Sequence, residues 1–197
     1  MDRRQFLFGA AAAAPLLGAR SAFGAEPGPR DAELRALLDT FWNADLDAAP
    51  QMATERGLDV GPRAAQRGKL NDASRAGRNA WIAARKERLA ALARISPEDL
   101  SPAARVDHEV TTYTYRRTLD GGMKYDFGEG QAGFGYAPYS PYVLSQLTGA
   151  YQAIPDFLDS RHPVRTTEDA EAYLSRLEAY AMALDANTQA LALDAAK

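Results

Sequence analysis

The sequence has 197 residues, which suits one domain with a sizeable buried core, and its formal net charge is only −3 at pH 7. It contains no cysteine, which excludes disulfides, cysteine-ligated zinc and thiol nucleophiles. No stripe of lysines and arginines with interleaved aromatic residues occurs, and this argues against nucleic acid as a partner.

The first 25 residues have the pattern of an export signal. Residues 3–7 read Arg-Arg-Gln-Phe-Leu and precede a short apolar run, which is the twin-arginine pattern of bacterial export. Small residues from Ser21 to Ala25 offer a cleavage site, and an uncleaved anchor is the alternative. The run is too short and too rich in alanine for a stable membrane span. We therefore expect a signal peptide over residues 1–25 and a periplasmic protein over residues 26–197.

The spacing of apolar residues predicts helices along most of the mature chain. Helix starts are expected at Asp31, Pro50, Asn71 or Asp72, and Ser101-Pro102. The last helix is expected to begin after Thr166, with Asp169 completing an approximate capping box. Residues 110–115 are β-branched and aromatic, but the capping signal before them favours a helix over a strand. The predicted fold class is all-α.

The same spacing assigns an inner and an outer face to each helix. In the helix that ends near Ile95, a basic side is expected to face solvent, namely Arg75, Arg78, Arg85, Lys86 and Arg88. In the helix from 102 to 120, which Gly121-Gly122 should end, the inward residues are expected to be Val106, Val110 and Tyr113. These assignments place apolar side chains in the core and charged ones in water.

The last helix keeps one apolar stripe up to Lys197 without a glycine or proline. A chain that stops inside such a helix is expected to be cut, so the helical array should be incomplete. Three leucines near this end should be at least partly exposed, because no following element covers them: Leu184, Leu191 and Leu193.

One long segment, 127–164, is rich in glycine, proline and aromatic residues and connects two of the predicted helices. Within it, Pro155 is expected to begin a short helix and Pro163 to end it. Tyrosine offers a ring for stacking and a hydroxyl for hydrogen bonds, so residues here are candidates to line a substrate groove. Packing of loop against helix is the alternative. The groove candidates are Tyr136, Tyr139, Tyr142, Gln146 and Tyr151.

The sequence contains no complete catalytic or metal-binding motif. His108-Glu109 begins like a zincin helix, but position 112 is threonine and the only other histidine is His162. Residues 128–133 match the glycine spacing of a dinucleotide loop, but no strand precedes them. Five acidic residues could serve acid–base chemistry or bind calcium, namely Asp156, Asp159, Glu168, Asp169 and Glu171. For Glu168 and Asp169, a place at the start of a helix is the simpler explanation. We therefore assign no catalytic residue, metal or cofactor to this chain.

A series of short motifs resembles one bacterial family, the domain of unknown function 885. The motifs are Pro50-Gln-Met-Ala-Thr-Glu-Arg-Gly-Leu-Asp, Leu70-Asn-Asp, Leu100-Ser-Pro-x-x-Arg105-x-Asp107, Ser140-Pro-Tyr, Gly149-Ala-Tyr, Ile154-Pro-Asp-Phe-Leu and Asp169-Ala-Glu-x-Tyr-Leu-x-Arg-Leu. They span nearly all of the mature chain. Members of this family are largely helical, often exported, and similar to zinc metallopeptidases.

The resemblance implies that this chain is the N-terminal helical portion of such a protein. The family's metal-binding His-Glu stretch lies further C-terminal, so no residue here receives a catalytic role. The implied role is one wall of a substrate channel, with the C-terminal half as partner and a peptide as substrate. Zinc, and zinc-assisted amide hydrolysis, are expected only in the full-length protein. The alternative is a stand-alone periplasmic helical module that binds a partner without catalysis.

Overall fold

The computed structural model describes residues 26–124, 142–146 and 148–196, and every regular element within these ranges is a helix. The elements are α1 (Asp31–Ala48), α2 (Pro50–Glu55), the 3-10 helix η1 (Gly61–Gly68), α3 (Arg75–Leu92), the 3-10 helix η2 (Pro97–Asp99), α4 (Pro102–Lys124), α5 (Ala150–Ser160) and α6 (Thr167–Ala195). The all-α prediction is confirmed. The predicted signal and the dinucleotide-like glycines lie outside the described residues.

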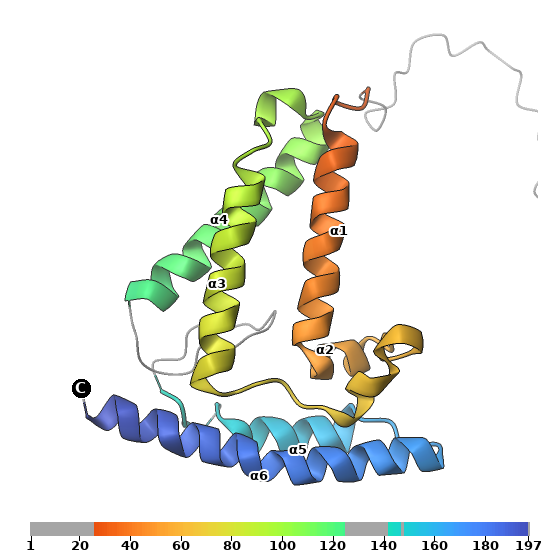
Figure 1. Cartoon of the computed structure of the whole chain (residues 1–197), viewed down its shortest axis with the longest axis vertical. Coiled ribbons are helices and arrows are strands. Elements are labelled where there is room, and N and C mark those ends of the chain that lie inside the picture. Colours follow the sequence, from red (N-terminus) through yellow and green to blue (C-terminus); the bar gives the residue numbers. More distant parts are fainter. Residues whose placement is uncertain (1–25, 125–141, 147, 197) are drawn as a thin grey trace, which may run out of the picture.

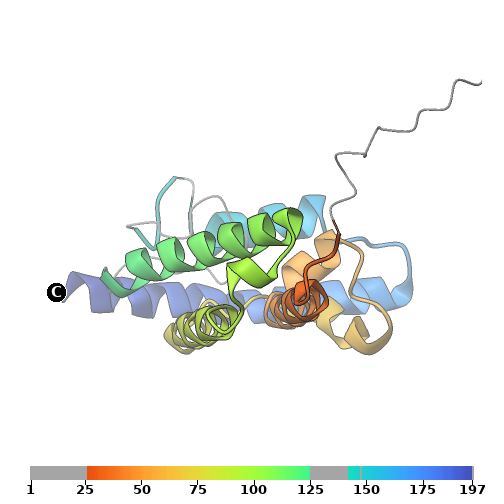
Figure 2. The ribbon, with the colours of Figure 1, turned by 90° about the horizontal axis from the view of Figure 1, so that it is seen from above.

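The helices form two groups, and the second lies across one end of the first (Figure 1). The first group contains α1, α3 and α4, in which α4 packs against both other helices. The second contains α5 and α6, an antiparallel pair that runs across one end of the first group (Figures 1 and 2). Close contacts of α2 with α1 and of η1 with α6 connect the two groups.

Each group has its own hydrophobic core. The core of the first group is built from Leu34, Phe41, Leu92, Ile95, Leu100 and Tyr115. The core of the second group is built from Ala150, Ile154, Phe157, Leu158 and Ala183. Burial of each large apolar side chain contributes about 1.5–3 kcal/mol. The predicted start of α1 at Asp31 is confirmed, and Leu34 and Phe41 of this helix are buried.

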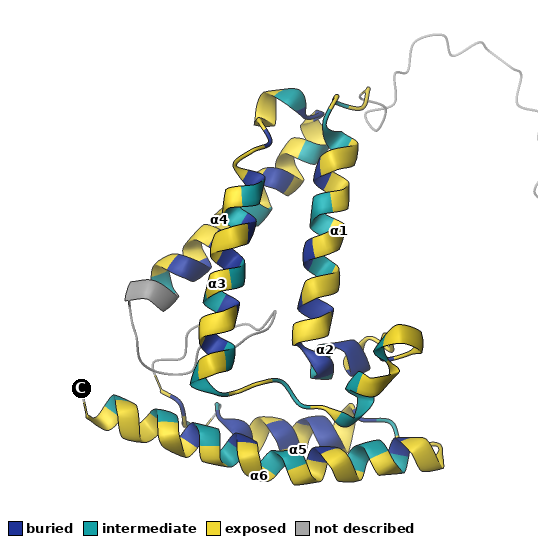
Figure 3. Cartoon of the chain, viewed as in Figure 1, coloured by how far each residue is buried: buried dark blue, intermediate teal, exposed yellow. Residues whose placement is uncertain are grey.

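The inner face of α4 differs from the predicted one. Val106, Val110 and Tyr113 are exposed, whereas His108 and Tyr115 are buried against α1 and α3 (Figure 3). The prediction was wrong because it followed apolar character alone, while the buried face of α4 carries His108, which donates to the Leu92 carbonyl, and Tyr115, which packs against buried arginines of α3. The helix also continues beyond Gly121 to Lys124, so the glycine pair does not end it.

The predicted basic face of α3 is wrong for three of its five residues, whereas Lys86 is exposed as predicted. Arg78, Arg85 and Arg88 are all buried, and they share the inner face of the helix with Trp81. Long side chains allow arginine to span the space between α3 and α1, where close backbone contacts are few. The helix begins two or three residues later than predicted, because Ser74 rather than Asn71 or Asp72 is its cap.

Helix α5 begins at Ala150, five residues before the proline that was predicted to start it. Pro155 lies inside the helix and has no N–H to donate to the Tyr151 carbonyl. The Tyr180 hydroxyl of α6 donates to that carbonyl instead, at 3.3 Å. A partner from another helix therefore makes the internal proline tolerable.

Helix α6 begins as predicted and exposes part of its apolar surface. Thr166 and Asp169 form a complete capping box, which confirms the predicted start. Several large apolar side chains on α6 are exposed, namely Leu174, Leu177, Met182, Leu191 and Leu193. The expectation for Leu191 and Leu193 is confirmed, whereas Leu184 is half-buried against α5. Among the described helices, none is long and apolar enough to cross a membrane.

Candidate functional site

Three of the five predicted groove residues lie in the turn before α5 or at the start of that helix, namely Tyr142, Gln146 and Tyr151. The Tyr151 hydroxyl donates to the Ser145 carbonyl at 2.6 Å, and the Thr148 hydroxyl donates to the Tyr142 carbonyl at 3.4 Å. Tyr142 is 65% exposed and Tyr151 46%. Hydrogen bonds thus hold a turn that presents two tyrosines to solvent. Tyr136 and Tyr139 lie outside the described residues.

Gly149 determines the shape of this turn. Its φ of +114° is a conformation that other residues rarely adopt, and a Cβ atom here would lie 2.3 Å from the Leu144 side chain. The backbone N–H of the next residue, Ala150, donates to the buried Asn187 side chain of α6 at 2.7 Å. The turn is therefore fixed to the second helical group.

A buried ion cluster joins the three helices of the first group. Oδ1 of Asp45 on α1 accepts from Nη1 of Arg85 at 2.9 Å and from Nη1 of Arg88 at 2.7 Å. The Arg85 guanidinium lies 4.8 Å from the ring centroid of Tyr115 on α4, and that of Arg88 lies 5.2 Å from the Phe41 ring. These rings favour the second positive charge, which the single carboxylate does not neutralise. The cluster is a structural connection between α1, α3 and α4.

Arg176 organises the second group in a similar way. It is completely buried, and its guanidinium donates to the carbonyls of Lys69 and Gln66, to the Thr54 hydroxyl and to Nδ1 of His162. Burial lowers the pKa of Arg176 to about 10, although the negative charge of Asp59 opposes that shift. One side chain of α6 thereby contacts α2, η1 and the end of α5.

Among the acidic residues near α6, Asp169 acts as a cap of that helix. Asp169 accepts hydrogen bonds from the backbone N–H groups of Arg165 and Thr166, and it pairs with Arg67 at 2.9 Å. The backbone bond from Arg165 is the main reason that the pKa of Asp169 is lowered, and the Arg67 charge adds to it. Its four predicted neighbours are exposed, namely Asp156, Asp159, Glu168 and Glu171.

The two histidines of the chain do not fit a zinc site. Nε2 of His162 donates to the Asp169 carbonyl at 3.0 Å, and Nδ1 accepts from Arg176 at 2.6 Å, so neither nitrogen can ligate a metal. Nε2 of His108 donates to the Leu92 carbonyl at 3.0 Å. Within the part of the chain that the structure describes, no group of three or more metal-ligating side chains lies together.

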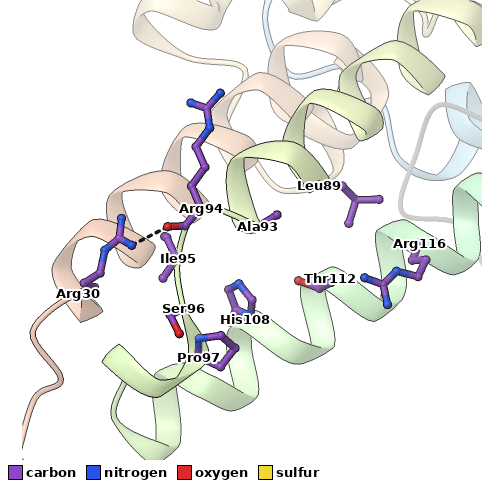
Figure 4. A pocket seen from close by; sticks show the side chains of 10 residues that line it. All are labelled: Arg30, Leu89, Ala93, Arg94, Ile95, Ser96, Pro97, His108, Thr112 and Arg116. Atoms are coloured by element: carbon purple, nitrogen blue, oxygen red, sulfur yellow. Dashed lines mark hydrogen bonds between the residues drawn. The ribbon is translucent and has the colours of Figure 1, made fainter.

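A cleft of about 480 Å³ opens between the C-terminal end of α3 and the first half of α4 (Figure 4). Its lining is Arg30, Leu89, Ala93, Arg94, Ile95, Ser96, Pro97, His108, Thr112 and Arg116. No aspartate or glutamate occurs among these lining residues. The Arg30 guanidinium donates to the Arg94 carbonyl at 2.6 Å and is paired with Glu33. The cleft therefore combines an apolar wall with three arginine side chains, of which Arg30 is neutralised by Glu33.

His108 lies at the base of this cleft and is only 6% exposed. Its Nδ1 atom is buried and has no hydrogen-bond partner among the described residues, and the same holds for Oγ1 of Thr112. Sequence reasoning considered this histidine only as a failed zinc motif and did not consider Arg116. The signal that points to the cleft is the four-residue spacing of 108, 112 and 116, which places all three side chains on one side of a helix.

The comparisons with known proteins identify the family and go no further. A family model described as bacterial protein of unknown function (DUF885) matches residues 50–197. Neither curated proteins nor solved structures yield a match to this chain. The match covers most of the chain and confirms the resemblance that the sequence motifs indicated. The chain belongs to the DUF885 family of bacterial proteins of unknown function.

Proposed function

We propose that this chain is the N-terminal helical portion of an exported, peptidase-like zinc protein and forms one wall of its substrate channel. The observation that carries this proposal is the pair of apolar surfaces that α4 and α6 expose. Val106, Val110 and Tyr113 share one face of α4, while the exposed leucines and Met182 of α6 are distributed around and along that helix. Exposed apolar surface of this kind marks contact with another element or domain.

The occupant that we propose for these surfaces is the C-terminal half of the same protein, which would carry the zinc ligands. Both ring nitrogens of His162 are engaged, and among the described residues no group of metal-ligating side chains lies together, so the proposal assigns no zinc ligand to this chain. The proposed role of this chain is to bind and orient a peptide substrate. The exposed rings of Tyr142 and Tyr151, held by the turn before α5, support that role.

The proposed location is the periplasm, reached through the twin-arginine pathway after cleavage of residues 1–25. The Arg-Arg-Gln-Phe-Leu pattern at residues 3–7 supports it.

A stand-alone periplasmic binding module is the second candidate function. The cleft at His108 favours it, because all the residues that line the cleft belong to α3, the connection from α3 to η2, η2 itself, α4 and the turn at Arg30. A module of this kind would bind its ligand without a C-terminal half of the protein.

The test is to express the complete product of the reading frame and measure its zinc content and its hydrolysis of a peptide mixture. The proposal expects one zinc per molecule and a measurable rate. In that protein, Tyr142→Ala should raise KM with little change in kcat, since a wall residue contributes to binding. Val164→Ala, at a position that is also exposed, is the matched control. A product without zinc and without hydrolysis would favour the binding module.

A further inference from the structure

Three polar side chains of α4 follow one another along the base of the cleft: His108, Thr112 and Arg116 (Figure 4). Each is four residues from the next, so they lie on one side of the helix. That side faces Leu89 and Ala93 of α3, with Ile95 and Pro97 at the end of the cleft. The cleft thus presents a polar row opposite an apolar wall.

The hydrogen-bonding role of each group follows from its partners. A carbonyl can only accept, so the proton of neutral His108 resides on Nε2, which donates to Leu92. Nδ1 is then a buried acceptor without a partner among the described residues. The hydroxyl of Thr112 is also buried and also has no partner among the described residues. Arg116 contributes a guanidinium to the lining of the cleft. Buried polar atoms of this kind are rare, because each carries an uncompensated desolvation cost.

The ligand that complements these groups has one N–H donor, one carboxylate and one apolar side chain. A carboxylate accepts from both a guanidinium and a hydroxyl, and such charge-assisted bonds are the strong ones. An amide N–H satisfies the Nδ1 lone pair. An apolar side chain fits the wall of Leu89, Ala93, Ile95 and Pro97, and 480 Å³ lies in the size range of small-molecule sites.

We propose that this cleft binds an N-acylated apolar amino acid through its free carboxylate, either as a small molecule or as the last residue of a peptide. Arg116 and Thr112 hold the carboxylate, and His108 accepts from the amide N–H. The site lies wholly within this chain, so the proposal does not depend on the proposed channel or on zinc.

The experiment is an NMR titration of the full chain with N-acetyl-leucine, with chemical shifts followed for His108, Thr112 and the Arg116 side chain. A ligand of this size is expected to bind with a Kd of about 1 mM. Two altered ligands test the contacts without altering the protein. N-acetyl-leucinamide lacks the carboxylate and should bind at least about tenfold more weakly. N-acetyl-N-methyl-leucine lacks the N–H and should also bind several-fold more weakly.

Substitutions of the cleft residues test the same contacts with an unaltered ligand. Arg116→Gln should weaken N-acetyl-leucine binding about tenfold but leave N-acetyl-leucinamide binding unchanged. Arg117→Gln removes an equal charge from a neighbouring exposed position outside the cleft and should have little effect. Thr112→Val preserves the side-chain shape and should weaken binding several-fold.

Acetyl-Ala-Ala-Leu distinguishes the two sources of the ligand. Binding at least as tight as that of N-acetyl-leucine assigns the site to a peptide end, and binding of N-acetyl-leucine alone assigns it to a small molecule. Either result supports the carboxylate site. The proposal is overturned if N-acetyl-leucine shows no saturable shifts at these residues up to about 20 mM. Equal binding of the amide, or equal losses in Arg116→Gln and Arg117→Gln, would also overturn it.

Discussion

Arg88 of α3 donates a 2.7 Å hydrogen bond to Asp45 of α1, across 43 positions of the sequence. Both side chains are 8% exposed, and Arg85 donates to the same carboxylate oxygen. A single acidic residue therefore holds two buried arginines in the centre of the first helical group. This relationship determines which face of α3 turns inward.

Removal of this carboxylate should be costly. Asp45→Ala leaves two buried guanidinium groups without their anion, and such a loss typically costs about 3–5 kcal/mol of folding free energy. Asp47→Ala is the matched control, because Asp47 pairs with Arg63 on the surface and its side chain is 60% exposed. The control should cost less than about 1 kcal/mol. Urea unfolding of both variants measures the difference, and similar losses would show that the buried cluster is not specially stabilising.

Acid should weaken the connection at the start of α6. The pKa of Asp169 is lowered in the folded protein, chiefly by the backbone N–H of Arg165, with smaller contributions from Thr166 and Arg67. Its contribution to stability is therefore complete above the ordinary aspartate pKa of about 3.9 and is lost as the pH falls through the lower folded value. In urea unfolding, the stability gap between the native chain and Asp169→Asn should narrow from pH 5 to pH 3. A stability difference that stays constant from pH 5 to pH 3 would contradict the stabilising role of the ionised Asp169 carboxylate.

The isolated chain should bind zinc only weakly. His162 has both ring nitrogens engaged, and His108 has one engaged and no acidic or histidine neighbours in its cleft among the described residues. Catalytic zinc needs three protein ligands, which these residues do not supply. Calorimetric titration should show no tight stoichiometric site. Tight binding that disappears in His108→Ala would show that the zinc motif was wrongly dismissed.

Export should depend on the arginine pair at positions 3 and 4. The twin-arginine receptor reads these two residues, so replacing both with lysine should keep the protein in the cytoplasm. Fractionation of cells that express the native and the Lys-Lys chains measures this directly. Unchanged delivery to the periplasm would rule out the twin-arginine route.

Local rules were sufficient for the parts of the fold that depend on neighbouring residues. The start of α1 at Asp31, the start of α2 at Pro50 and the Thr166–Asp169 capping box follow from the residues within one turn. The exposed leucines near the end of α6 followed from the same periodicity.

The features that were predicted wrongly depend on hydrogen-bond partners that lie far away in the sequence. Nothing local to α3 shows that Arg85 and Arg88 turn inward, because the acceptor Asp45 lies about 40 residues earlier. The position of Pro155 inside α5 likewise depends on a hydroxyl from Tyr180. Burial of polar residues depends on such tertiary pairs, which a hydrophobic pattern does not contain.

The candidate site was predicted only in part. Tyrosine content drew attention to Tyr142 and Tyr151, whose rings are exposed in a hydrogen-bonded turn. The cleft at His108 was missed, because single residues were tested against known motifs. The four-residue spacing of His108, Thr112 and Arg116 was the available signal, although only the tertiary structure shows that two of their polar atoms have no hydrogen-bond partner among the described residues.

Hydrogen exchange of residues 180–197 tests the central claim, that the exposed face of α6 is covered by the rest of a larger protein. The measurement compares the isolated chain with the same chain followed by its downstream sequence. Our account predicts faster exchange in the isolated chain, since Leu191 and Leu193 are exposed there, and strong protection when the downstream sequence is present. Equal, strong protection in an isolated monomer would contradict it and would make the stand-alone binding module the better description.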